Sequence, residues 1–252
     1  MTSTPVGMRC PECTRERTVV KNIGGRPGSS DAPATYVFIG LCVLGFLGQL
    51  ATGGDLFRGG GTLGFDGLFF APFADAGEWY RTVSYGFLHS GVLHLGLNLL
   101  ALYILGSLLE PAIGTRRFVA IFVISVLGGA LGVALIEPGS PTVGASGGVF
   151  GLMAAAFLIA RDRGMDELAS QIGFFVVINL VFTFSVPRVS IGGHIGGLLA
   201  GAAVAFAIST VGRRRGTQPQ PGLEAIVLLG ILAAVVVATV VAVSGTSEPT
   251  IS

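Results

Sequence analysis

One serine and one histidine lie in short glycine-rich segments that each open an apolar stretch. Ser146 belongs to residues 144–151, of sequence GASGGVFG, and His194 belongs to residues 192–197, of sequence GGHIGG. Glycines four residues apart, such as Gly144 and Gly148, let two helix backbones approach closely. A neutral imidazole can take the proton of a serine hydroxyl and activate the oxygen for attack on a carbonyl carbon. If the two segments meet, the pattern predicts nucleophilic serine chemistry.

Three further polar side chains, those of His89, His94 and Asn98, lie at or near the start of another apolar stretch. His94 and Asn98 are four residues apart and share one face of a helix. Both can donate hydrogen bonds to the oxyanion that forms during serine attack, as can backbone N–H groups beside Ser146 at the start of its helix. Alternatively, the glycines serve packing alone and Ser146 bonds its own backbone; the clustering of all three histidines favours chemistry.

Helices in a membrane must position these residues. The chain has 252 residues, of which 51% are hydrophobic and 12% charged, whereas a soluble domain has about 25% charged residues. Mean hydropathy is +0.78. Lipid requires that each spanning segment satisfies its own backbone groups, so we expect an all-α polytopic membrane protein. Seven spans are expected at 35–51, 92–109, 118–136, 143–160, 170–186, 190–211 and 223–243; a six-span alternative loses the fifth.

Positive charges fix the expected orientation. Twelve of the fifteen lysines and arginines fall in the N-terminal tail and in the second, fourth and sixth connecting segments. Such charges accumulate on the cytoplasmic side, so we expect a cytoplasmic N-terminus and an external C-terminus. Spans two, four and six then begin at the outer face, which places His94, Ser146 and His194 at one depth. No Asp or Glu lies in the outer half of any span, so we expect a dyad without a carboxylate.

These residues resemble the motifs of the rhomboid family of intramembrane serine proteases, in the same order along the chain. The GASG run at 144–147 resembles the nucleophile motif of the family, which implies that Ser146 is the nucleophile. Gly193 and His194, with Gly197 and Gly201 downstream, resemble its base-bearing helix. The resemblance therefore implies a rhomboid-like helical bundle with seven transmembrane helices, six of them forming the catalytic core.

The resemblance also implies roles for the neighbouring residues. His94 and Asn98 are implied to assist the oxyanion, and His89 to brace the site. Phe150 stands where the family often has a tyrosine stacked against the histidine, and phenylalanine can still stack. Further structural motifs of the family resemble the segments around Trp79, Arg81, Glu110 and Gly114. We expect Glu110, at the inner end of the second span, to anchor a helix end or loop.

The family resemblance implies a serine endopeptidase that needs no cofactor and cleaves transmembrane helices of single-pass or polytopic membrane proteins near their outer ends. Substrates are expected to enter from the bilayer beside the loop at 53–90 or the fifth span. Two alternatives stay open: a catalytically idle rhomboid-like protein that binds client helices, and a transporter of small solutes. A transporter usually contains an internal repeat, and the sequence shows none.

Three regions are expected: a flexible cytoplasmic tail at 1–34, the six-helix core at 35–211, and a basic loop, seventh span and short external tail at 212–252. The tail contains Cys10 and Cys13 at the spacing of a zinc knuckle. A zinc site needs four ligands, so we favour an unpaired knuckle, although a second chain could complete a site. The net charge of +1 argues against nucleic-acid binding, and the arginine-rich composition favours a bacterial source. The oligomeric state stays open.

Overall fold

The computed structural model describes residues 2–4, 7–9, 32–213 and 221–246, and the chain divides into two compact units, 1–31 and 32–252. In the first unit, strands β1 (Thr2–Thr4) and β2 (Gly7–Arg9) pair antiparallel, with Thr2 opposite Arg9. Cys10, Cys13 and most of the tail expected to be flexible lie outside the described residues.

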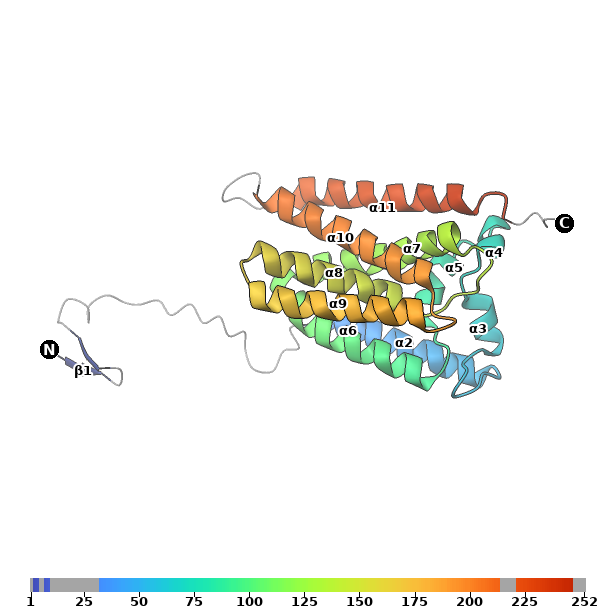
Figure 1. Cartoon of the computed structure of the whole chain (residues 1–252), viewed down its shortest axis with the longest axis horizontal. Coiled ribbons are helices and arrows are strands. Elements are labelled where there is room, and N and C mark those ends of the chain that lie inside the picture. The colour runs from blue at the N-terminus through green and yellow to red at the C-terminus, as the bar shows by residue number, and fades with distance from the viewer. Residues whose placement is uncertain (1, 5–6, 10–31, 214–220, 247–252) are drawn as a thin grey trace. The chain divides into compact units, whose positions relative to one another are not determined.

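The described part of the second unit is a helical bundle in which short helices gather at one end of the long ones (Figure 1). The short helices α3 (Gly61–Gly67), α4 (Ala71–Asp75) and α5 (Arg81–Ser84), with a 3-10 turn at Tyr85–Phe87, lie within the loop expected at 53–90. The long helices are α2 (Pro33–Ala51), α6 (Val92–Ile113), α7 (Thr115–Ile136), α8 (Ser146–Asp162), α9 (Asp166–Ser185), α10 (Ile191–Arg213) and α11 (Pro221–Val243).

Six of the long helices, all except α8, are long and apolar enough to cross a membrane. The expected all-α polytopic membrane fold is therefore confirmed, and the alternative that loses the fifth span is wrong because α9 is one of the six. The count of seven spans is not confirmed: α8 has 17 residues and is about 26 Å long, shorter than the hydrocarbon core of about 30 Å. It begins at Ser146, so residues 143–145, expected in the fourth span, form part of the preceding loop.

Glycines bring the backbones of α7, α8 and α10 into direct contact. A Cβ placed on Gly197 of α10 would collide with the carbonyl of Gly147 in α8, and one on Gly201 would collide with the backbone of Gly151. The other glycine stripe of α10 faces α7 instead. There, Gly192 and Gly196 meet the backbone carbonyls of Gly132 and Gly128. The sequence indicated the contact between α8 and α10 but not the second one with α7.

Glu110, near the end of α6, ties three helices together at the end of the bundle opposite the short helices. Its carboxylate accepts hydrogen bonds from the backbone N–H groups of Ala34 (2.9 Å) and Thr35 (2.8 Å), at the start of α2. It also accepts the side-chain hydroxyl of Thr35 and that of Thr115, each at 2.8 Å. The first N–H groups of a helix lack partners within it and favour a negative charge. Gly114 connects α6 to α7 at φ +87°, a conformation that favours glycine. The carboxylate of Glu110 thus joins the end of α6 to the first residues of α2 and α7.

We predict that Glu110→Ala lowers the free energy of unfolding by about 2–4 kcal/mol, because it leaves buried donors without their charged acceptor. Glu224→Ala is the matched control. It removes a carboxylate whose bidentate partner Arg117 is partly exposed, and it should cost less than about 1 kcal/mol. Reversible unfolding in detergent measures both losses, and equal losses would contradict the anchoring role.

Candidate active site

Ser146 is the first residue of α8, and the loop before it is held by the short helical segment. Gly144 donates its N–H to the carbonyl of Tyr85 (2.9 Å), and Thr142 pairs with Phe69 through two backbone hydrogen bonds. Gly144 adopts φ +132° and Ala145 returns to helical angles, so the chain turns sharply into α8. The N–H groups of the first helical turn have no partner within the helix. These donors lie beside the serine, where an oxyanion would form.

His194 lies in the first turn of α10 and faces Ser146 across the glycine contact. Its Nε2 is 2.8 Å from the Ser146 Oγ, and the residue is 8% exposed. Phe150, one turn after Ser146, stacks on the imidazole with a ring-centroid distance of 4.2 Å and an interplanar angle of 20°. The structure therefore brings together the serine, the histidine and the aromatic ring that the sequence had placed in two separate segments.

The second ring nitrogen of His194 has a partner that the sequence analysis missed. Nδ1 is 2.7 Å from the Oγ1 of Thr183, near the end of α9. The starts of spans two, four and six were expected to lie at the depth of the site. Because span five runs in the opposite direction, its last residues share that depth, and a polar residue between Phe182 and Phe184 was the available signal.

The Nε2 atom of His94 lies close to Gly144 and to the side chain of Ser146. The Ser90 N–H (3.3 Å) and Ser90 Oγ (2.9 Å) approach its Nδ1. Because the backbone N–H can only donate, Nδ1 accepts and the ring proton is on Nε2. An ideal Cβ at Gly144 would lie 2.9 Å from that Nε2 and 3.5 Å from the Ser146 Oγ. The absence of a side chain at Gly144 thus leaves a small space between a hydrogen-bond donor and the serine.

Asn98 and His89 are both buried, and no hydrogen bond joins either of them to Ser146 among the described residues. Asn98 donates from Nδ2 to the backbone carbonyl of His94 (2.9 Å), one turn earlier. His89 packs edge-on against His94, with ring centroids 5.2 Å apart. Burial, and secondarily the nearby His94, lower the pKa of His89 to about 3, so its ring is neutral.

His89 is fixed through its backbone. Gln49 of α2 accepts its N–H (2.9 Å) and donates to its carbonyl (3.1 Å). Neither ring nitrogen makes a hydrogen bond of ordinary geometry in the part of the chain that the structure describes, although the backbone of Phe87 lies close enough to oppose the lowering of the His89 pKa. His89 also lies at the wall of a cavity of about 370 Å³, together with Arg58, Phe65 and Ser90. His89 thus lies against His94 and is held by Gln49 of α2.

Comparison with known proteins gives the family of the chain. The Rhomboid domain matches residues 76–211, more than half of the chain. The chain belongs to the rhomboid family. Over 177 residues it is 33% identical to Rhomboid protease GluP of Bacillus subtilis (strain 168), a match that covers 69% of this chain and 34% of that protein.

Two eukaryotic relatives match shorter stretches of this rhomboid. RHOMBOID-like protein 5 of Arabidopsis thaliana is 37% identical over 142 residues, which are 53% of this chain and 45% of that protein. Rhomboid-like protease 3 of Toxoplasma gondii is 33% identical over 144 residues, which are 55% of each chain. The chain thus spans between about a third and about half of the length of these relatives.

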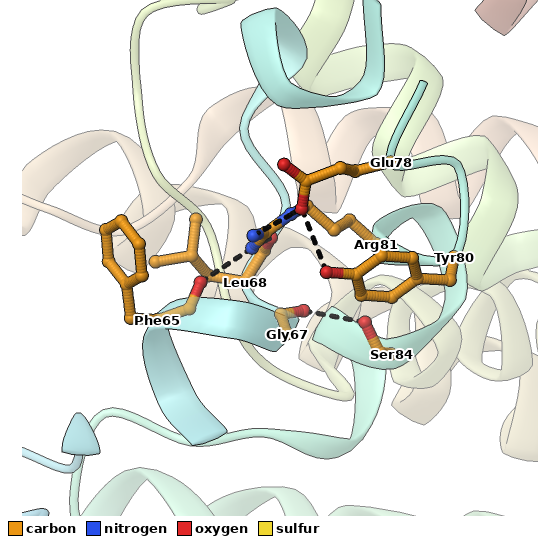
Figure 2. Close-up of polar contacts among 7 residues, drawn as sticks. All are labelled: Phe65, Gly67, Leu68, Glu78, Tyr80, Arg81 and Ser84. Atoms are coloured by element: carbon orange, nitrogen blue, oxygen red, sulfur yellow. Dashed lines mark hydrogen bonds and ion pairs between the residues drawn. The ribbon is translucent and has the colours of Figure 1, made fainter. Parts of the chain in front are cut away.

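Arg81 of this rhomboid braces the short helices (Figure 2). Its guanidinium donates to the backbone carbonyls of Phe65 (2.6 Å) and Leu68 (3.1 Å) and to the carboxylate of Glu78 (2.8 Å). That carboxylate also accepts the Tyr80 hydroxyl (2.9 Å). The hydrogen bonds from Arg81 and Tyr80 lower the pKa of Glu78. Arg81 therefore holds the segment against which the loop before Ser146 pairs.

The carboxylate nearest the start of α10 caps that helix and does not extend the dyad. Glu137, just after α7, accepts hydrogen bonds from the Ser190 hydroxyl and from the Gly192 N–H. Ser190 in turn accepts the Gly193 N–H at 2.9 Å. Both ring nitrogens of His194 are already bonded to hydroxyls. The geometry is thus that of a serine–histidine pair without a carboxylate.

We predict that Gly144→Ala abolishes reaction of Ser146 with a fluorophosphonate. The new methyl group would contact the His94 imidazole at 2.7 Å, fill the space beside the serine and strain a backbone at positive φ. Gly139→Ala in the same loop is the matched control, because a Cβ there meets nothing within 4 Å. Gel fluorescence after labelling measures the effect, and equal labelling of both variants would contradict it.

Proposed function

We propose that this rhomboid is an intramembrane serine endopeptidase that cleaves transmembrane helices of other membrane proteins, with Ser146 as nucleophile and His194 as general base. The observation that carries the proposal is the 2.8 Å approach of His194 Nε2 to Ser146 Oγ at the start of α8. At this position a base, a nucleophile and unpaired backbone donors lie together. The relatives from Bacillus subtilis and Toxoplasma gondii are both named as proteases, which supports the same activity.

The proposed reaction follows from the hydrogen bonds of the site. His194 Nε2 takes the proton of the Ser146 hydroxyl while Oγ bonds to the carbonyl carbon of the substrate. The carbonyl oxygen becomes negative and accepts hydrogen bonds from N–H groups at the start of α8 and from His94 Nε2. His194 then gives its proton to the departing amine nitrogen as the peptide bond breaks. Water, deprotonated by His194, hydrolyses the acyl-serine ester and restores both residues.

The proposed orientation places the site near the outer face, with the N-terminus in the cytoplasm. The excess of arginine in the segments on the opposite side supports this orientation. A helical peptide bond is shielded by its own hydrogen bonds, so the substrate must unwind before attack. Small and helix-destabilising residues near its outer end favour unwinding.

We propose that the catalytic core comprises the six long helices α2, α6, α7, α8, α9 and α10 with their connecting segments, and that α11 is an added helix. Few residues of α11 are buried. A bidentate pair between Glu224 of α11 and Arg117 of α7 (2.6 and 2.7 Å) attaches it to the core. The dyad and the residues that bond or stack against it all lie outside α11.

We predict that Ser146→Ala and His194→Ala each lower cleavage of a model transmembrane substrate by more than about 1,000-fold, because each removes half of a unit that acts together. Ser107→Ala is the control, since this serine is exposed on α6 and should leave cleavage unchanged. The measurement is the rate of product formation by purified protein in detergent or vesicles.

The same variants distinguish the alternatives. Cleavage that persists in both Ser146→Ala and His194→Ala would refute the dyad. A wild-type protein that binds client helices but neither cleaves them nor reacts with a fluorophosphonate would support the catalytically idle alternative.

A further inference from the structure

Thr183 is the buried polar side chain of a helix that is otherwise largely exposed. The buried residues of α9 are Ala169, Ile172 and Thr183, and Thr183 is 1% exposed. Its hydroxyl makes two contacts of 2.7 Å, one with the carbonyl of Asn179 and one with His194 Nδ1. These two contacts assign the proton of each group.

The Thr183 hydroxyl has one proton, and the geometry directs it to the Asn179 carbonyl, which can only accept. This bond to the preceding turn is common for threonine in helices. The Thr183 oxygen therefore meets His194 with a lone pair, so Nδ1 must carry the imidazole proton. A neutral imidazole with its proton on Nδ1 has a free lone pair on Nε2. That lone pair faces Ser146, where a general base needs it.

We propose that Thr183 is a positioning residue that fixes the tautomer and rotation of His194, an inference that rests on the proposed role of His194 as general base. Phe150 covers one face of the ring and restrains its plane. Thr183 and Ser146 hold the two nitrogens and restrain rotation within that plane. A neutral oxygen thus supplies the orientation that an aspartate supplies in a serine–histidine–aspartate triad.

Other threonines of the chain show what a merely structural hydroxyl looks like. Thr239 of α11 bonds the Val235 carbonyl at 2.8 Å and is 4% exposed. It matches Thr183 in burial and in its bond to the preceding turn, but no hydrogen bond joins it to an imidazole in the described part of the chain. Thr239→Val therefore removes the same local interaction as Thr183→Val without touching His194.

Thr183 also belongs to a helix that carries neither member of the dyad. Ser146 lies on α8 and His194 on α10, whereas the acceptor for Nδ1 comes from α9. The orientation of the His194 ring therefore depends in part on a contact from a third helix.

The kinetic test compares Thr183→Val, Thr183→Ser and Thr239→Val with the wild type on one transmembrane substrate. Thr183→Val should lower kcat by about 10- to 100-fold, the range known for partners that orient a metal-bound histidine, and leave KM within about twofold. Thr183→Ser keeps the acceptor and should restore kcat to within about threefold of wild type. Thr239→Val should be unchanged. An unchanged kcat in Thr183→Val, or an equal loss in Thr239→Val, would overturn the proposal.

A spectroscopic test does not depend on cleavage. The chain has three histidines, so nitrogen NMR of protein labelled in the imidazole rings can resolve each tautomer, with His194→Ala identifying the signal. Wild type should show a protonated Nδ1 and a bare Nε2 at His194, and Thr183→Val should show a gain of the other tautomer. A protonated Nε2 in neutral wild-type His194 would overturn the proposal.

The two tests separate the possible failures. If wild-type protein cleaves no substrate, the proposed protease fails, while the tautomer of His194 still decides the role of Thr183. If Thr183→Val does not fold, the wild-type tautomer and the activity of Thr183→Ser decide it.

Discussion

The backbones of α8 and α10 are in direct contact, and the hydrogen bond between Ser146 and His194 requires this contact because the serine side chain is short. A serine hydroxyl extends only one bond beyond Cβ, so His194 can reach it only if the helices approach without intervening side chains. Gly147 and Gly197 permit this approach, since a methyl group on Gly197 would collide with the carbonyl of Gly147. The close contact of α10 with α7 through a second glycine stripe holds the same helix from another side. The 2.8 Å bond between Ser146 and His194 depends on both contacts.

Glu110, Glu137 and the pair Ser146–His194 lie at or near helix ends, where backbone groups lack partners within the helix. At one end, Glu110 receives the first N–H groups of α2 and joins three helices. At the other, Glu137 receives an N–H group at the start of α10, just before His194. The start of α8 differs, because its serine faces an imidazole and its N–H groups are available to a ligand. Anchoring and chemistry thus use the same property of a helix terminus.

Much of the fold and part of the site could be predicted from the sequence. Apolar stretches predict the long helices because length and composition alone decide whether a helix crosses a membrane. They extend α8 too far, since Val143 is apolar but belongs to a loop that pairs with the short helical segment. Glycine spacing indicates that Ser146 and His194 can meet, but spacing cannot show that Gly192 and Gly196 face α7. The contact of Thr183 with His194 was not predicted, because it depends on which helix ends lie together in the folded bundle. The sequence of one span gives no information on that.

The bonding of His194 to two hydroxyls, with Phe150 on its face, has an electrostatic consequence. The resting site contains neutral hydroxyls and neutral imidazoles, so no ion has to be stripped of its hydration shell when the bundle assembles in lipid, a step that costs several kcal/mol per buried ion. In the proposed reaction, positive charge on His194 and negative charge on the substrate oxygen arise together and disappear together. The two charges attract strongly in a medium of low dielectric constant. The site thus separates charge only for the duration of the reaction.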